Sequence, residues 1–184
     1  MKEKKLLWHQ VVLFAVMFLL TGVRLLTGKW SFNLGIAQWW LGGVLGFLFV
    51  FFDRLIQLLV VEPSRVLDVR VKEMFAKGQI KLGLTTLLTE REQQTRLVMR
   101  SILFVFVWIF FSIWTWTSVA HPLSRGFMLG LGTHLIFDLT WDYLKDKVMF
   151  KRWFWQIKRE IPETEMRVFA LIGIVGYVIL AWVL

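Results

Sequence analysis

The sequence predicts an all-α membrane protein, a polytopic transmembrane helical bundle with about five spans. Of the 184 residues, 57% are hydrophobic and 19% are charged. The hydrophobic residues fall in long runs, whereas a soluble core is built from short periodic stretches. A run of about 20 apolar residues crosses the hydrocarbon layer as a helix. The composition therefore excludes a soluble domain and makes the lipid bilayer the first expected partner.

The aromatic content and the charge both indicate contact with lipid headgroups. The chain is Trp-rich, with 11 Trp, and its net charge is +9. Trp favours the membrane interface, and a positive surface is attracted to anionic inner-leaflet headgroups, so no nucleic acid is expected as a partner. The chain contains no Cys, which excludes a disulfide framework, a thiolate nucleophile and a thiolate metal site.

Residues 1–184 are expected to form a single integral membrane domain. The predicted spans cover about residues 6–26, 36–61, 101–120, 126–144 and 168–184. The basic N-terminus resembles the start of a signal peptide, but the apolar run extends to Leu26 without a clear small-x-small cleavage site. We therefore expect an uncleaved first helix.

Residues 62–100 form the only extended polar region and are predicted to be a cytoplasmic amphipathic helical loop. Four apolar residues share one helical face in its first half: Leu67, Val71, Met74 and Phe75. Thr89-Glu-Arg-Glu92 matches the capping-box pattern. A new helix is therefore expected to start there and to run through Arg96 and Arg100 into the third span.

The fourth span follows a predicted turn at residues 121–125 and is the least apolar of the five. It contains His134, Asp138 and Asp142, and each Asp at a helix centre costs about 2.5 to 3.5 kcal/mol on insertion scales. Hydropathy alone would therefore reject this span. The argument for it is the distribution of Lys and Arg residues between the two sides of the membrane.

Five crossings give the stronger excess of Lys and Arg on the inner side. The inner side then holds the basic residues near the N-terminus, eight in residues 62–100 and seven in residues 145–167, and the outer side holds Arg24, Lys29 and Arg125. If the fourth segment does not cross, the seven basic residues of 145–167 lie on the outer side, and the excess of Lys and Arg on the inner side nearly disappears. We expect a bacterial inner (cytoplasmic) membrane, with the N-terminus cytoplasmic and the C-terminus outside.

An intramembrane polar cluster is the candidate site. Its members are the ionisable residues of the second and fourth spans: Asp53, Arg54, His134, Asp138 and Asp142. Such residues usually face the interior of a bundle and pair with one another. His134, Asp138 and Asp142 are spaced by four residues, so they share one helix face. Asp53 and Asp138 lie at similar depths, so they meet if their helices are neighbours.

Three functions remain open for this cluster. His134, Asp138 and Asp53 are candidate ligands for a divalent Zn, Mn or Mg ion, which would lower the pKa of bound water and supply a hydroxide nucleophile. In the structural alternative, Arg54 or another basic residue neutralises Asp138 or Asp53, and His134 hydrogen-bonds across helices. We favour the structural alternative because a catalytic metal normally has three protein ligands and one His is few. The third possible function is a path for protons or ions through the membrane, because Asp and His residues inside membranes often relay protons.

Two other features are expected to be structural. His9 beside Trp8 and His121 before Pro122 are expected to be solvated interfacial residues and not ligands. Small-residue faces on the second and fourth spans permit close helix contacts, within one chain or in a homo-oligomer. The glycines carry no phosphate-loop lysine signature, so no other cofactor-binding site is expected.

Two segments resemble the bacterial membrane-bound metal-dependent hydrolase-like inner-membrane proteins, over roughly residues 36–144. They are Phe51-Phe-Asp53-Arg54-Leu-Ile and Leu-Gly-Thr-His134-Leu-Ile-Phe-Asp138. In that family, an Asp-His pair closes one helix, further His residues open another, and His-x-x-x-Asp lies in a later one. His134 and Asp138 match the last element, and Asp53 matches the first Asp.

The sequence departs from the family pattern at two positions. Arg54 stands where the family has a His, and Met99-Arg100 stands near where another His is expected. A cation in place of a ligand opposes metal binding through lost coordination and charge repulsion. The resemblance therefore implies the fold of a divergent relative more than its activity. We expect a structural, assembly or binding function, with a membrane-embedded metal-dependent hydrolase and a small-molecule or ion transporter as alternatives.

Overall fold

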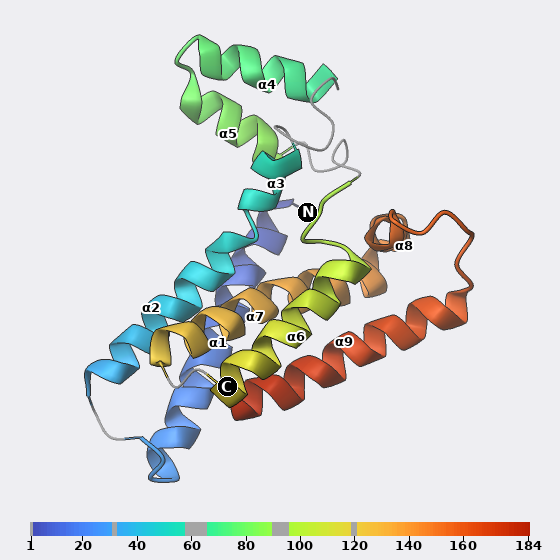
Figure 1. Cartoon of the computed structure of the whole chain (residues 1–184). Helices are drawn as coiled ribbons and strands as arrows, with labels where there is room; N and C mark the ends of the chain where they lie inside the picture. The colour runs from blue at the N-terminus through green and yellow to red at the C-terminus, as the bar shows by residue number, and fades with distance from the viewer. Residues whose placement is uncertain (1, 31–32, 58–65, 90–95, 119–120) are drawn as a thin grey trace.

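The computed structural model describes residues 2–30, 33–57, 66–89, 96–118 and 121–184, and no strand occurs among them. The elements, shown in Figure 1, are α1 (Lys2–Leu26), α2 (Leu34–Phe49), α3 (Phe52–Ile56), α4 (Val66–Ala76), α5 (Ile80–Thr89), α6 (Ile102–Ser118), α7 (Pro122–Lys145), α8 (Lys147–Lys151), the 3-10 helix η3 (Arg152–Phe154) and α9 (Glu163–Val183). The predicted all-α class is confirmed.

Three segments are long and apolar enough to cross a membrane. They are Trp8–Leu26, Leu34–Ile56 and Glu163–Val183. The apolar helix α6 has 17 residues and is shorter than these three. Helix α7, which carries the predicted polar face, is not among them. Length and composition therefore support a membrane protein through three of the five predicted spans.

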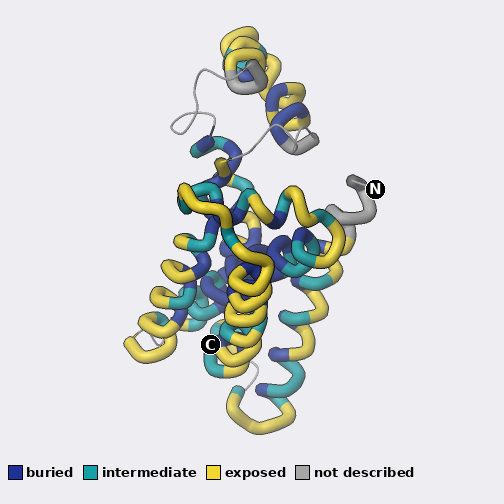
Figure 2. Tube along the Cα trace, turned by 90° about the vertical axis from the view of Figure 1, so that its right-hand side faces the viewer, coloured by how far each residue is buried: buried dark blue, intermediate teal, exposed yellow. Residues whose placement is uncertain are grey.

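Helix α7 lies at the centre of the bundle. It packs against α1, α2, α6 and α9, and its middle is almost continuously buried. In Figure 1 the connection from α1 to α2 and the C-terminus lie toward one end, whereas α3 and α8 lie toward the other. Figure 2 shows the buried residues gathered inside the bundle and the exposed ones on its outward faces. The polar helix is thus enclosed by apolar ones.

The contact between α2 and α7 depends on glycines that bring the two backbones together. The four that face the other helix's backbone most closely are Gly42, Gly46, Gly126 and Gly130. A Cβ at Gly46 would collide with the carbonyl oxygen of Phe127, and one at Gly130 would collide with the carbonyl oxygen of Gly43. Small residues allow such close approach between membrane helices. These glycine faces therefore serve a contact within the chain.

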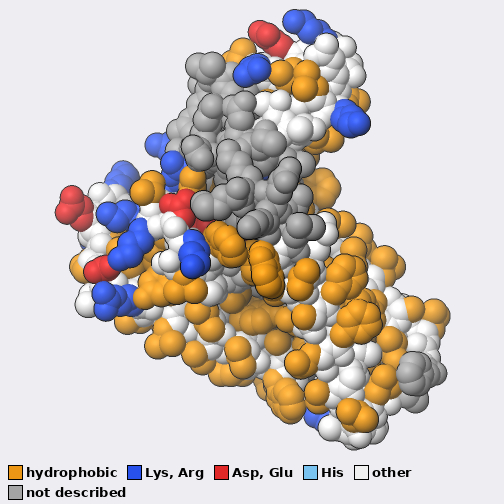
Figure 3. Space-filling view, turned by 180° about the vertical axis from the view of Figure 1, so that it is seen from behind, with side chains coloured by type: hydrophobic (Ala, Val, Ile, Leu, Met, Phe, Trp, Pro, Cys, Tyr) orange, Lys and Arg blue, Asp and Glu red, His pale blue; other side chains and the backbone are white. Residues whose placement is uncertain are grey.

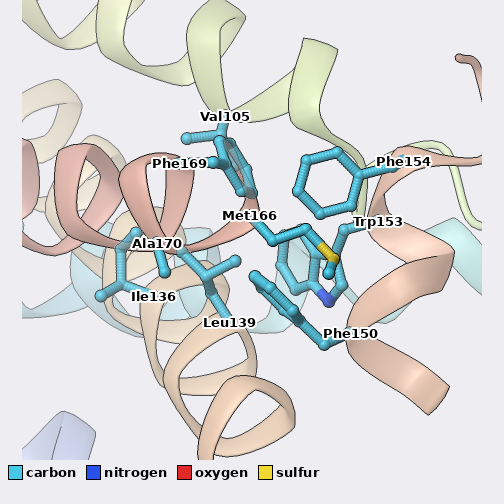
Figure 4. Close-up of a cluster of buried hydrophobic side chains, with 9 residues drawn as sticks. All are labelled: Val105, Ile136, Leu139, Phe150, Trp153, Phe154, Met166, Phe169 and Ala170. Carbon is cyan, nitrogen blue, oxygen red and sulfur yellow. The ribbon is translucent and has the colours of Figure 1, made fainter. Parts of the chain in front are cut away.

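The other side of α7 packs against α6, α8, η3 and α9 through a hydrophobic cluster. Figure 4 shows its buried members: Val105, Ile136, Leu139, Phe150, Trp153, Phe154, Met166, Phe169 and Ala170. The ring centroids of Phe154 and Phe169 are 5.1 Å apart in an edge-to-face arrangement, which is favourable for aromatic pairs. This cluster fixes the end of α7 against the start of α9.

Helices α4 and α5 form a hairpin beyond the bundle. Gly78, with a φ of 73°, provides the left-handed residue of the turn between them. Val71 and Leu87 are buried in the hairpin and pack against Leu55 of α3. Val71 lies on the apolar face predicted for this region, whereas the second helix of the pair was not predicted.

Two predicted local structures are wrong. Thr89 ends α5, and residues 96–101 are not helical, so no helix runs through Arg96 and Arg100 into α6. Residues 90–95, which include most of the capping-box pattern, and residues 58–61 of the second predicted span lie outside the described residues. Residues 122–125 form the first turn of α7 instead of a loop, because His121 caps the helix and Pro122 is suited to its first position.

The glycine contact gives a direct prediction for stability. Gly130→Ala should lower the free energy of unfolding by about 1 to 3 kcal/mol, because the added methyl group meets the backbone of α2. Gly22→Ala in α1 is the matched control, since a Cβ there has no neighbour within 4 Å. The measurement is denaturant unfolding in a maltoside detergent. Equal stability of the two variants would contradict close packing of α2 on α7.

Candidate functional site

Asp138 of α7 is the centre of a buried group of charged and imidazole side chains. Its carboxylate is completely buried. Oδ2 lies 2.6 Å from Nη2 of Arg100, and Oδ1 lies 3.0 Å from Nε2 of His9. Nε2 of His134 lies 3.5 Å from Oδ2. These four residues, the Asp138 cluster, join α1, α7 and the segment that precedes α6.

Arg100 and Asp138 form an ion pair shielded from solvent. The side chain of Arg100 is 6% exposed and that of Asp138 is 0% exposed. A charge taken out of water is costly unless an opposite charge meets it at close range. The pair therefore satisfies the structural expectation that a basic residue neutralises Asp138, and the residue that does so is Arg100.

His134 is oriented by the backbone of α2. Its Nδ1 lies 2.8 Å from the carbonyl oxygen of Phe47, and because a carbonyl only accepts, Nδ1 carries the hydrogen and donates. The imidazole ring is also enclosed by Phe47 and Phe51, with ring centroids 4.5 and 5.0 Å away. The expected hydrogen bond of His134 across helices is therefore present.

The hydrogen bond to Phe47 determines what His134 presents to Asp138. In a neutral imidazole with a hydrogen on Nδ1, Nε2 is an acceptor. This nitrogen is buried without a hydrogen-bond partner, and it faces the carboxylate across 3.5 Å. The oxygen that it faces, Oδ2, is the one that Nη2 of Arg100 contacts at 2.6 Å, so this carboxylate already has a cation beside it. Nε2 of His134 thus carries a buried lone pair beside the carboxylate and is the ring atom that a metal ion would bind.

Asp53 lies outside the Asp138 cluster and orders the segment that carries Arg100. Its Oδ1 accepts the backbone N–H of Val98 at 2.8 Å, and its Oδ2 accepts that of Arg100 at 3.2 Å. These bonds to the backbone explain why the segment before α6 is not helical. Asp53 thereby positions Arg100 and does not share a ligand group with His134 and Asp138.

Arg54 and Asp142 each connect a different pair of elements. Nη1 of Arg54 donates to the carbonyl oxygen of Leu87 at 2.8 Å, which joins α3 to α5. Asp142 is buried, and its Oδ2 accepts the indole N–H of Trp153 at 3.2 Å, which joins α7 to η3. The five predicted residues are all buried, but they belong to several separate contacts and not to one cluster.

His9 was not predicted as a site residue, and its expected solvated position is wrong. The side chain is 8% exposed and hydrogen-bonds to Asp138. Its position at the start of an apolar run suggested an interface. The run begins at the same end of the bundle as the polar part of α7, and this common depth is the signal that would have indicated the contact.

The nitrogen and oxygen atoms of the Asp138 cluster could coordinate a divalent metal, but Arg100 opposes it. Ligand atoms of His9, His134 and Asp138 all lie within 4.8 Å of one another, and this is the one such group among the residues that the structure describes. Two imidazoles and one carboxylate match the three protein ligands of many catalytic zinc sites. Arg100 opposes a metal, because its guanidinium is already in contact with Asp138.

No family model matches the sequence, and comparisons with curated proteins and with solved structures gave no match. The resemblance to metal-dependent hydrolase-like membrane proteins therefore stays a prediction.

Proposed function

We propose that this chain is a non-catalytic membrane protein of five spans, whose Asp138 cluster holds the helices of the bundle in register. The observation that carries the proposal is the buried ion pair of Arg100 and Asp138, with 2.6 Å between Nη2 and Oδ2. The pair joins the segment before α6 to α7, and His9 adds α1 to it. In this role the protein is a scaffold or assembly component and catalyses no reaction.

The outward faces of four helices support a lipid environment around α7. Large apolar side chains are exposed on α1, α2, α6 and α9, among them Phe14, Phe18, Leu41, Leu45, Leu103, Phe106, Phe110, Leu171, Val175 and Val178. Figure 3 shows hydrophobic side chains over the bundle, with Lys and Arg mainly at the end that carries α8 and on the hairpin. An enclosed α7 crosses the bilayer without contact between its Asp residues and lipid.

The charge distribution supports a bacterial inner membrane with the α8 end of the bundle cytoplasmic. The seven Lys and Arg of residues 145–167 then face the same side as those of residues 62–100, as the positive-inside rule requires. Basic residues near a membrane surface are attracted to anionic headgroups, which makes the inner leaflet the partner of this end.

Single cysteines test the five crossings, because the natural chain contains no Cys. Lys29→Cys and Arg125→Cys should react with a membrane-impermeant maleimide added to intact spheroplasts, since five spans put both residues outside. Lys77→Cys and Lys158→Cys lie on the cytoplasmic side in this arrangement and should react only after the membrane is permeabilised. Reaction of Lys158→Cys in intact spheroplasts would contradict the crossing of α7.

A double-mutant cycle tests the scaffold role. Asp138→Asn should lower the free energy of unfolding by about 3 to 5 kcal/mol, because it leaves the buried charge of Arg100 without its partner. Arg100→Gln should have a similar effect, and the double variant should recover a large part of the loss. The measurement is denaturant unfolding in detergent. Strictly additive effects would refute the scaffold role.

The exposed ion pair of Lys147 and Glu163 is the matched control for this cycle. Nζ and Oε1 lie 3.0 Å apart, but the side chains are 77% and 55% exposed. Solvent and salt screen such pairs. Lys147→Gln and Glu163→Gln should therefore show no measurable coupling energy under the same conditions.

A metal-dependent hydrolase is the second candidate, and the convergence of His9, His134 and Asp138 favours it. These three would hold the ion, with His134 oriented as a ligand by its bond to Phe47. Such an ion supplies a nucleophile by lowering the pKa of bound water.

Metal binding distinguishes the two candidates. The second candidate predicts about one Zn or Mn per chain by elemental analysis, lost in His9→Ala and His134→Ala. Arg100→Gln should then bind the metal more tightly, because it removes a neighbouring cation, even though it weakens the scaffold. Asp142→Asn is the control outside the ligand group. Protein without metal after incubation with these ions would exclude this candidate.

A further inference from the structure

A buried cation lies at the other end of α1 from His9. Arg24 is 8% exposed, and its guanidinium carbon lies 4.7 Å from the ring centroid of Trp30 and 5.1 Å from that of Trp39. Its Nη1 is buried and has no hydrogen-bond partner. The aromatic rings attract a cation, but they offset only part of the cost of removing it from water.

The helix ends around Arg24 carry no Asp or Glu side chain. Residues 4–52, 93–137 and 166–184 contain neither Asp nor Glu, and they include all of α2 and α6. Arg24 takes part in none of the ion pairs among the described residues. This end of the bundle thus has an excess of positive charge.

Trp39 adds a second donor without an acceptor. Its side chain is 0% exposed, and its Nε1 has no hydrogen-bond partner. Buried polar groups in native proteins are almost always hydrogen-bonded, so two such donors beside one another indicate a missing acceptor. Arg24 and Trp39 come from two different helices, α1 and α2, and Nη1 of the first and Nε1 of the second are the donors without an acceptor.

We propose that Arg24 and Trp39 form a binding site for a phosphate-class oxyanion. The site lies where α1 ends and where α2 and α7 begin, toward the lower left in Figure 1. A tetrahedral oxyanion offers several acceptor oxygens to donors from both helices, and guanidinium groups suit phosphate particularly well. The partly exposed Trp30 covers Arg24, so the oxyanion enters by displacing this ring.

Two sources supply this chemistry. In the five-span arrangement Arg24 lies two residues from the end of its helix, near the depth of the headgroups, so the phosphate of an outer-leaflet phospholipid is one source. Dissolved inorganic phosphate is the other. The site is far from the Asp138 cluster along α1, so neither the scaffold role nor a metal there is required for it.

The test uses the full chain purified in a maltoside detergent, which contains no phosphate. One measurement is the phospholipid phosphorus retained per chain, and the other is the thermal unfolding midpoint in sodium phosphate compared with sodium chloride at equal ionic strength. Arg24→Gln removes the charge and keeps a polar side chain. Lys29→Gln is the matched control, since it removes a cation from the same end of the bundle.

If a lipid is the source, wild type and Lys29→Gln retain phospholipid that Arg24→Gln loses. If dissolved phosphate is the source, phosphate raises the midpoint of wild type and Lys29→Gln but not that of Arg24→Gln. Equal results for all three proteins in both measurements would overturn the proposal. An equal loss in Lys29→Gln and Arg24→Gln would also overturn it, because general surface charge would then be sufficient.

Trp39→Phe keeps the test decisive if Arg24→Gln does not fold. This variant keeps an aromatic ring beside the guanidinium and removes the indole donor. Loss of one hydrogen bond to a charged group should weaken phosphate or phospholipid binding about tenfold. Unchanged binding in Trp39→Phe would overturn a site that includes this donor.

Discussion

The charge on Asp138 governs how the end of the bundle that carries α3 and α8 packs. A carboxylate enclosed by helices needs an opposite charge at close range, and Arg100 supplies it across 2.6 Å. Arg100 in turn depends on Asp53, which binds the backbone of its segment. Asp53 thus positions Arg100, and Arg100 neutralises Asp138. Residues that are far apart in the sequence are joined in this way into one network of polar contacts.

The glycines of α2 and α7 complete this arrangement. Because Gly46 and Gly130 let the two backbones approach, the carbonyl oxygen of Phe47 comes within hydrogen-bond distance of His134. A bulkier contact would separate these groups and leave the imidazole free to rotate. Close packing and the orientation of the polar cluster are therefore parts of the same contact.

The sequence predicts the helices better than it predicts their partners. Apolar length is a property of each segment alone, so the ranges found for α1, α6 and α9 overlap the predicted spans closely. The four-residue spacing predicts one shared helix face for His134, Asp138 and Asp142, and all three are buried on α7.

Other site features depend on tertiary structure and have no local signal. His9 lies 129 positions from Asp138, and no spacing rule connects them. The capping-box pattern at Thr89 is local, but the carboxylate of Asp53 takes the backbone N–H groups of Val98 and Arg100 that a helix would have used. Asp53 was predicted from its depth to meet Asp138, whereas its strongest interactions are with the backbone.

The enclosure of α7 also bears on the order in which the chain is made. Ribosomes deliver a protein from its N-terminus, so α1, α2 and α6 emerge before α7. In the five-span arrangement the carboxylates of α7 therefore arrive when three of the four surrounding helices already exist. Under the five-span proposal, the helices made first shelter the polar segment as it enters hydrocarbon, and α9 covers the remaining side last.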